Sequence, residues 1–336
     1  MIRLDAYFNY FNRFNRFNRF NKSTMKIGIS TNWNSSRHEK CGDLIDEIKA
    51  IGFEAVELGY NLTADQAAEI KAVADQGDID IDSVHAYCPV PIEAPHGYPE
   101  LHLLASLDED ERVMARIMVE KTLNFTAEIG AKAIVLHAGR IFLKSLFSNI
   151  NTYTLADATG AAGGNDGEHY LKLLKKAVKR RQARARRYFD GFCLSLDTIL
   201  PQFEELGITL CLENLPSIEA FPDMQEMLML KARYDTPALA YWHDIGHGQV
   251  REFFGWERHD EVVNTLLGVT RGCHIHDARP LLNDHLPPGR GAVDFDMLRG
   301  FTDDRIIKVF EPSRDVTPED LGKSLRFVRE RWAPAD

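Results

Sequence analysis

Several features that define common protein classes are missing from this chain of 336 residues. It contains no apolar run of roughly 18 residues, the length needed to cross a bilayer, so a membrane protein is not expected. Its five cysteines are scattered and form no Cys-x-x-Cys pair, which favours reduced thiols and a cytoplasmic location. No Gly-x-Gly-x-x-Gly motif follows the first expected strand, which argues against a dinucleotide-binding domain.

Basic charge is also scarce. Residues 25–336 contain 35 Lys and Arg against 49 Asp and Glu. Proteins that bind nucleic acid need a basic footprint for the phosphates, so nucleic acid is not an expected partner. The exception is the segment 172–187, where nine of sixteen residues are Lys or Arg and none is acidic. Two interpretations of this segment stay open: a solvated helix face, or a patch that attracts phosphate.

The first 24 residues are of low complexity. Phe recurs at every third position from Phe8 to Phe20, a spacing that matches neither a strand nor one face of an α-helix. We interpret residues 1–24 as an extension without function that is disordered or not native. Met25 is then the natural start, because MKIGIST leads directly into the first expected strand. An organellar presequence is the weaker alternative.

From Met25 onward, short apolar segments alternate with helical patterns. We expect strands at 26–31, 55–59, 79–86, 133–138, 207–213, 238–244, 271–276 and 305–311. We expect helices at about 42–51, 64–76, 109–130, 170–206, 222–232, 250–267 and 318–332. Eight buried strands separated by helices predict a single α/β domain over 25–336, a (β/α)8 TIM barrel. The long connection at about 139–169 is expected to form a lid over the catalytic end.

Most of the expected strands end in a residue that can bind a metal. Four apolar runs end in Glu213, Asp244, His274 and Glu311. In a closed barrel the carboxyl ends of the strands converge, so these side chains should meet. Three carboxylates and one imidazole at one point would repel strongly unless a cation lay between them, which predicts a divalent ion. The same end of the barrel should hold Glu57, His85, His137, His247 and His285.

Five motifs resemble those of the xylose-isomerase-like TIM barrels. They are ENLP at 213–216, HDIGH at 243–247, HIHD at 274–277, PGRGAVDF at 288–295 and FEPS at 310–313. The resemblance covers residues 25–332. This superfamily includes sugar isomerases and epimerases as well as endonuclease IV-type phosphodiesterases, so the resemblance implies two alternative sites.

The sugar epimerase pattern implies a single divalent ion, Mn²⁺, Co²⁺ or Mg²⁺, bound by Glu213, Asp244, His274 and Glu311. It also implies that His247 binds substrate oxygens and that Glu213 and Glu311 move a proton through an enediolate. The endonuclease-like pattern implies a zinc cluster of two or more ions, with the additional ligands His85, His137, His247 and His285. It has Asp where this chain has Asn283, and we expect the adjacent Asp284 to point elsewhere on an extended strand, so two zinc sites are the firmer prediction.

We favour the hydrolase, because a one-ion epimerase has no need of imidazoles at both His85 and His137. The predicted substrate is a phosphoester or phosphodiester in a small or cofactor-like molecule. The acidic barrel fits DNA repair poorly, and fold-level analogy suggests a cobamide nucleotide loop. The alternatives are a sugar or sugar-phosphate isomerase or epimerase and a barrel that binds without catalysis. A homo-oligomer is compatible with the sequence.

Four further residues receive supporting roles. Glu57 is predicted as a further base, or as an acceptor that orients a ligand histidine. Arg140, Arg279 and Arg290 follow expected strands and are predicted to bind phosphate oxygens of the substrate.

Overall fold

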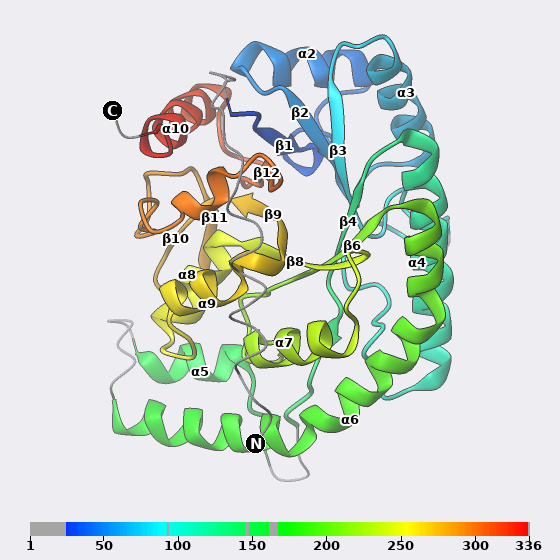
Figure 1. Ribbon diagram of the computed structural model, residues 1–336. Helices are drawn as coiled ribbons and strands as arrows, with labels where there is room; N and C mark the ends of the chain where they lie inside the picture. The colour runs from blue at the N-terminus through cyan, green and yellow to red at the C-terminus, as the bar shows by residue number, and fades with distance from the viewer. Residues whose placement is uncertain (1–24, 93, 145–147, 161–166, 335–336) are drawn as a thin grey trace.

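The computed structural model describes residues 25–92, 94–144, 148–160 and 167–334, so the predicted extension at 1–24 lies outside the described residues. Eight parallel strands form a closed barrel surrounded by helices (Figure 1). The strands are β1 (Gly28–Ser30), β2 (Ala55–Leu58), β3 (Asp80–His85), β4 (Ala133–Leu136), β6 (Thr209–Glu213), β8 (Leu239–Asp244), β9 (Thr270–Ile275) and β12 (Ile307–Phe310). Their order around the barrel is β1-β12-β9-β8-β6-β4-β3-β2. This topology confirms the predicted TIM barrel.

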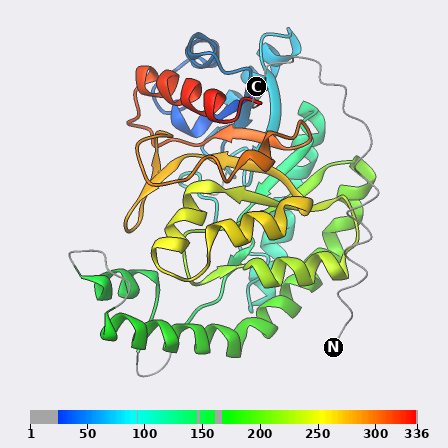
Figure 2. The same cartoon turned by 60° about the vertical axis from the view of Figure 1, so that its left-hand side comes forward.

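The helices form the outer layer. They are α2 (Cys41–Ile51), α3 (Ala64–Asp75), α4 (Glu109–Ile129), α5 (Thr152–Thr159), α6 (Glu168–Leu206), α7 (Met224–Arg233), α8 (Ile245–Phe253), α9 (His259–Leu266) and α10 (Pro318–Arg331). Figures 1 and 2 place α6 along the lower side of the molecule and α10 at the upper side. The single helix expected at 250–267 is in fact two helices, because Gly255 adopts a left-handed conformation with φ 64° just after α8.

Two short antiparallel pairs lie outside the barrel and were not predicted. β5 (Gly139–Arg140) pairs with β7 (Ala220–Phe221), and β10 (Asp277–Arg279) pairs with β11 (Asn283–Leu286). Strands of two to four residues have no periodicity long enough to recognise in a sequence. The β10–β11 pair directly follows β9 and therefore lies at the carboxyl end of the barrel.

The predicted lid at 139–169 contains β5 and α5. Residues 145–147 and 161–166 within it lie outside the described part of the chain. Among its described residues, only Arg140 lines the pocket that is presented below. A covering role for this segment stays a prediction.

The interior of the barrel is filled by a small apolar cluster. It consists of Ala133, Val135, Cys211, Ala240, Trp242 and Val309. The Trp242 ring occupies the space beside Gly272, where an added Cβ would lie 2.1 Å from a ring carbon. Glycine is therefore required at this position of β9. The packed interior forms a floor beneath the carboxyl ends of the strands.

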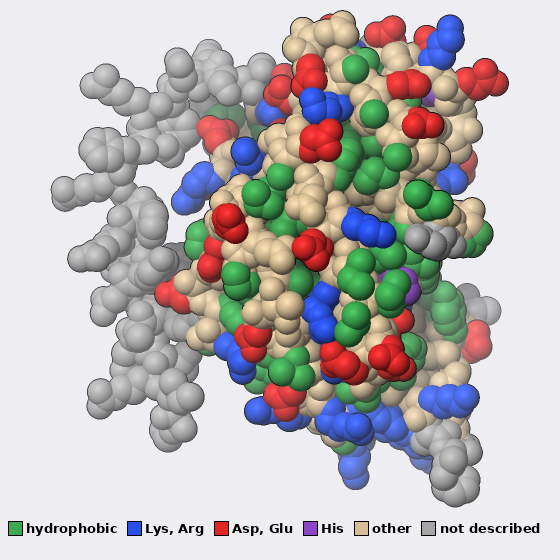
Figure 3. Space-filling model, turned by 90° about the vertical axis from the view of Figure 1, so that its right-hand side faces the viewer, with side chains coloured by type: hydrophobic (Ala, Val, Ile, Leu, Met, Phe, Trp, Pro, Cys, Tyr) green, Lys and Arg blue, Asp and Glu red, His purple; other side chains and the backbone are tan. Residues whose placement is uncertain are grey.

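The basic segment 172–187 lies on α6. Six of its side chains are exposed: Lys172, Lys175, Lys176, Lys179, Arg186 and Arg187. Figure 3 shows Lys and Arg side chains gathered along the lower edge of the molecule, where Figure 1 places α6. Arg181 is instead buried, and its guanidinium group pairs with Asp223 and Glu226 at 2.6 and 2.7 Å. Arg181 of this segment therefore stabilises the packing of α6 against the region around the start of α7.

All five cysteines are buried and free. Within the described ranges, no helix combines the length and the apolar character that a membrane crossing needs.

A buried pair of imidazoles lies on the outer side of the barrel wall. His243 on β8 and His259 at the start of α9 have their Nε2 atoms 2.9 Å apart. One ring must donate and the other accept, so at most one ring can be charged, and burial lowers the pKa of both, which favours two neutral rings. Gly248 on α8 leaves room for the pair, since a Cβ there would lie 2.5 Å from His259 Nε2. Burial lowers the pKa of His259 from 6.5 to about 4.

This pKa shift makes stability depend on pH. The unfolded chain binds the His259 proton near pH 6.5, whereas the folded chain binds it only near pH 4. Stability is therefore fully present above pH 6.5 and is lost as the pH falls toward 4, by about 3 kcal/mol as an order of magnitude. We expect His259→Gln to lose less free energy of unfolding over this range than the wild type, measured by urea titration. The exposed His96→Gln is the control and should behave as the wild type does. If the free energy of unfolding falls equally with pH in the wild type and in both variants, the prediction is contradicted.

Candidate functional site

Strand geometry explains why the predicted ligands converge. Side chains alternate along a strand, so a residue two positions after an interior residue also faces the barrel axis. The interior residues Val135, Cys211, Trp242 and Val309 are followed two positions later by His137, Glu213, Asp244 and Glu311. The same spacing relates Gly272 to His274 on β9. The fold therefore brings these side chains to one end of the axis.

Glu213, Asp244, His274 and Glu311 form a compact buried group. From His274 Nδ1 the distances are 3.2 Å to Glu213 Oε1, 3.2 Å to Glu311 Oε2 and 3.6 Å to Asp244 Oδ2. One potential ligand atom from each residue lies within 4.8 Å of the others. Three carboxylates and an imidazole in this arrangement can hold a divalent cation.

The electrostatics of this group favour ionised carboxylates. Burial alone would raise the pKa of Glu213 and of Asp244, but the neighbouring imidazoles hold both well below their usual values. Burial alone would lower the pKa of His274, but the carboxylates around it raise that pKa well above its usual value. Charged groups of both signs therefore share a buried space, where attraction between them is strong.

Glu57 lies beneath this group. Its Oε1 is 3.0 Å from His274 Nε2, and its Oε2 accepts a hydrogen bond of 2.8 Å from Ser83 Oγ. The carboxylate is fully buried and does not line the pocket. The structure therefore does not place Glu57 where the predicted base would reach a substrate. Its contacts match the other predicted role, an acceptor that orients a ligand histidine so that Nδ1 faces the carboxylates.

A second group of potential ligands shares Glu213. His85 Nε2 and His137 Nε2 each lie 3.2 Å from Glu213 Oε2. His85 Nδ1 lies 3.0 Å from the carbonyl oxygen of Ala86, which leaves Nε2 to face the site. Because Glu213 Oε1 faces His274 and Oε2 faces the two other imidazoles, this carboxylate connects the two groups. Both predicted histidines are thus at the site.

A third group lies where the barrel opens. His247, at the start of α8, has Nδ1 2.9 Å from the carbonyl oxygen of Asn214. His285 on β11 has Nδ1 2.8 Å from the carbonyl oxygen of Glu311. The expectation that Asp284 points elsewhere is wrong: it lines the pocket, and its Oδ2 lies 3.8 Å from His247 Nε2. His285 has φ 54°, so β11 is not regularly extended there and the alternation of side chains breaks down.

His276 belongs to the site but was not predicted. Its Nε2 lies 2.8 Å from Asp244 Oδ2, and its Nδ1 accepts a hydrogen bond of 2.8 Å from the backbone N–H of His285. It therefore connects β8, β9 and β11. The signal for it was present in the sequence, because His276 follows His274 by two positions and so faces the same side.

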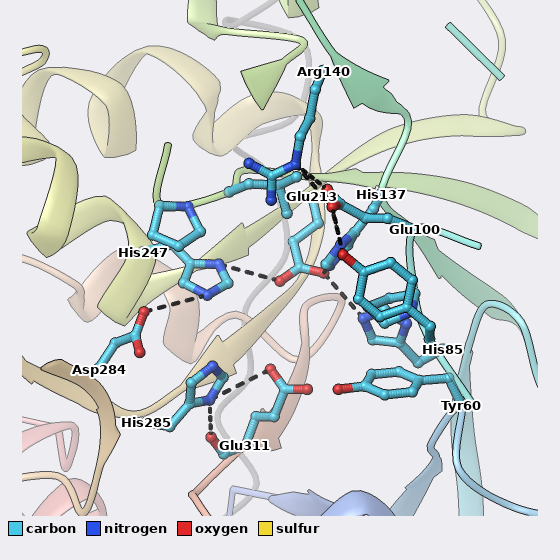
Figure 4. Close-up of a pocket in the computed structure, with 14 residues that line it drawn as sticks. Tyr60, His85, Glu100, His137, Arg140, Glu213, His247, Asp284, His285 and Glu311 are labelled. Carbon is cyan, nitrogen blue, oxygen red and sulfur yellow. Dashed lines mark hydrogen bonds and ion pairs between the residues drawn. The ribbon is translucent and has the colours of Figure 1, made fainter. Parts of the chain in front are cut away.

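An open pocket of about 220 Å³ lies above these groups (Figure 4). Its walls include several residues that were not predicted as site residues: Tyr60, Tyr98, Glu100, and Leu215 and Pro216 of the ENLP motif. Tyr60 follows β2 closely, and the strand ends could have suggested it. Glu100 lies in an irregular segment before α4, where no periodic pattern predicts the direction of a side chain.

The three predicted arginines are placed differently from one another. Arg140 lines the pocket, where its Nε donates to both carboxylate oxygens of Glu100 at 2.7 and 2.8 Å. Arg279 and Arg290 are exposed and do not line the pocket. Arg279 Nε donates to the carbonyl oxygen of Arg290, whose own side chain pairs with Asp320. The structure therefore does not bring these two arginines to the pocket: Arg279 is the last residue of β10, and Arg290 follows β11.

Solved structures share the fold over nearly the whole chain. A D-tagatose 3-epimerase-like protein is 19% identical, with a TM-score of 0.63 over 91% of this chain and 97% of its own. The 3-keto-D-glucoside 4-epimerase of E. coli is 17% identical, with a TM-score of 0.64 over 91% and 99%. The D-psicose 3-epimerase of Clostridium cellulolyticum H10 is 16% identical, with a TM-score of 0.63 over 92% and 99%. A search of curated proteins found no match.

The predicted function needs correction. The similar solved structures include epimerases of D-psicose and of a 3-keto-D-glucoside, which favour the alternative prediction, a sugar isomerase or epimerase. The favoured prediction of a phosphoester or cobamide hydrolase is wrong. It depended on His85 and His137, and imidazoles beside a carboxylate do not by themselves specify hydrolysis. The family resemblance is confirmed: residues 45–331 match the model of the xylose isomerase-like TIM barrel family, and the chain belongs to this family.

Proposed function

We propose that the protein is a metal-dependent epimerase of an uncharged ketose, acting at the carbon next to the carbonyl group. The observation that carries the proposal is the placement of Glu213 and Glu311. Each lies 3.2 Å from His274 Nδ1, and both enter the same pocket from different strands (Figure 4). Inversion at a carbon needs one group that removes a proton and another that returns one, and two carboxylates can do both. The epimerases among the similar solved structures support the same reaction class.

The residues present fit a divalent ion. Within the described ranges, no Lys or Arg forms an ion pair with Glu213, Asp244 or Glu311, so only imidazoles offset their charge. A bound cation would complete this buried set together with His274. When bound, such an ion polarises a carbonyl group and an adjacent hydroxyl. Mn²⁺, Co²⁺ and Mg²⁺ suit a set rich in carboxylates.

The side chains then have distinct roles in moving the proton. One of Glu213 and Glu311 removes the proton from the carbon beside the carbonyl, and the electron pair moves onto the carbonyl oxygen to give an enediolate. The other, already protonated, returns a proton to the opposite face of that carbon. Glu57 acts as a positioning residue, because it holds the His274 ring from below.

The charges of the pocket favour a substrate without phosphate. Arg140 is the only arginine among the described lining residues, and Glu100 already occupies its Nε. Its Nη1 donates to Ser217 Oγ at 2.9 Å. A phosphate group would compete with these contacts and would lie near Asp284 as well as Glu100. We therefore propose an uncharged sugar as the substrate, and not the phosphorylated molecule that was predicted from the sequence.

We further propose that His85, His137 and Glu213 hold a second ion, for which zinc suits the two imidazoles. After dialysis of the zinc-loaded protein, elemental analysis should find two ions per chain in the wild type and one in His137→Ala. The exposed His169→Ala is the matched control and should keep both. An equal metal content in wild type and His137→Ala would contradict the second site.

The epimerase proposal is tested by turnover in D₂O. The Mn²⁺-loaded protein is incubated with D-tagatose, D-psicose, D-fructose and L-ribulose, and the products are separated by chromatography. At least one ketose should yield an epimer that carries deuterium on the inverted carbon, because a carboxylate proton exchanges with solvent between turnovers. Absence of both epimer and deuterium across ketoses and with Mn²⁺, Co²⁺, Mg²⁺ and Zn²⁺ would refute the proposal.

A further inference from the structure

The β10–β11 pair is held rigidly over the edge of the pocket. Asp277 Oδ2 accepts hydrogen bonds from the backbone N–H groups of Gly289 and Gly291 at 3.0 and 2.7 Å. His285 is fixed at both backbone groups: its N–H donates to His276 Nδ1, and its carbonyl oxygen accepts from the N–H of Ser313 at 2.9 Å. These bonds stabilise the left-handed conformation that turns both Asp284 and His285 toward the pocket.

Three hydrogen-bond acceptors consequently face one another at this edge. A backbone carbonyl only accepts, so the Nδ1 atoms of His247 and His285 carry the hydrogen of each neutral ring, and both Nε2 atoms are acceptors. The Asp284 carboxylate lies 3.8 Å from His247 Nε2, and no hydrogen bond joins it to another described residue. We call His247, Asp284 and His285 the rim triad (Figure 4).

Because Asp284 and His285 are partly exposed, water supplies the donors for these acceptors, and a ligand that brings donors can take the place of that water. Sugar hydroxyl groups are such donors. The carboxylate of Asp284 is the strongest of the three acceptors, because hydrogen bonds to ionised groups are stronger than those between neutral groups. His285 lies outside the group around His274 Nδ1 but forms, with His247 and His276, a separate group of potential ligand atoms within 4.8 Å of one another, and Asp284 belongs to neither group.

We propose that the rim triad is a subsite that recognises hydroxyl groups of the sugar away from the carbon that is inverted. The proposal rests on the proposed epimerase function and adds to it the part of the substrate that decides specificity. A site built to accept hydrogen bonds from hydroxyl groups discriminates strongly against an analogue that lacks them, since its own polar groups then stay unpaired. Asp284 is the specificity-determining residue in this arrangement.

Binding of galactitol tests the subsite separately from catalysis, because this polyol has hydroxyl groups but no carbonyl group to react. Isothermal titration of the Mn²⁺-loaded protein is expected to give a Kd about 10-fold or more higher for Asp284→Ala than for the wild type. Asp284→Asn keeps one acceptor oxygen and should fall between the two. Asn283→Ala, an exposed neighbour on the same strand, is the matched control and should bind like the wild type.

Other outcomes are equally decisive. If Asp284→Ala binds galactitol as the wild type does, or if the wild type does not bind it at all, the proposal is overturned. If Asp284→Ala or His285→Ala loses one metal ion per chain by elemental analysis, the rim triad is a cation site and the proposal is overturned as well. If no ketose is epimerised while galactitol binding still weakens in Asp284→Ala, the epimerase function fails and the subsite stands.

Discussion

Glu311→Gln is expected to lower the rate of epimerisation by about 10²–10⁴-fold, the usual contribution of a general acid or base. Glu311 reaches the pocket at the end of β12 and lies 3.2 Å from His274 Nδ1. The amide retains an oxygen that can bind a cation, but it can neither remove nor return a proton. Elemental analysis of the variant should therefore still find metal. The ketose that gives the highest rate with the wild type serves as the probe, and its conversion is followed by chromatography.

Isotope exchange separates a proton-transfer role from a structural one. In Glu311→Gln, Glu213 is still able to remove the proton from one epimer, so that epimer should exchange with D₂O although it is not inverted. In Glu213→Gln the other epimer should exchange instead. The exposed Glu319→Gln on α10 is the control and should behave as wild type. Loss of exchange from both epimers in both variants would refute the assignment of two separate bases.

The barrel was predictable because its signal is strong and repeated. Each expected strand overlaps an observed one, since a strand buried on both faces is a short, continuous apolar run. The β10–β11 pair was not predictable, because it is short and polar and depends on contacts distant in sequence. Asp277, whose side chain accepts from Gly289 and Gly291, is an example of such a contact.

The site residues were also predictable where they lie on barrel strands and not where they lie in loops. Residues at strand ends were predictable, because alternation along a strand determines which side chains face the axis, and Glu213 and His274 are examples. Residues in loops were not: Glu100 was missed and Arg279 was misplaced. Asp284 was wrongly assigned because the rule of alternation was applied to a strand in which His285 has a positive φ. The substrate class could not be reached either, because the same ligand positions serve different reactions.

Removal of the metal should abolish turnover and also destabilise the fold. Glu213, Asp244 and Glu311 lie around His274 in a buried space, and only the folded chain brings these four ligands together around one ion. A ligand that binds only the folded state stabilises it in proportion to the logarithm of its concentration. At an ion concentration about 1,000 times its Kd, the gain in free energy of unfolding is about 4 kcal/mol. The thermal midpoint should therefore fall by several degrees after treatment with EDTA and recover when Mn²⁺ or Co²⁺ is added.

Asp244→Asn tests whether this gain comes from the predicted site. Asn keeps the size of Asp but lacks the charge, so the variant should gain less stability from Mn²⁺ than the wild type does. It should also be less stable than the wild type when both are metal-free, because the neighbouring imidazoles hold the pKa of Asp244 well below its usual value and its charge therefore stabilises the folded state. The exposed Asp304→Asn is the matched control and should respond to Mn²⁺ as the wild type does. A thermal midpoint that EDTA leaves unchanged in the wild type, together with unchanged turnover, would show that the fold and the reaction need no ion.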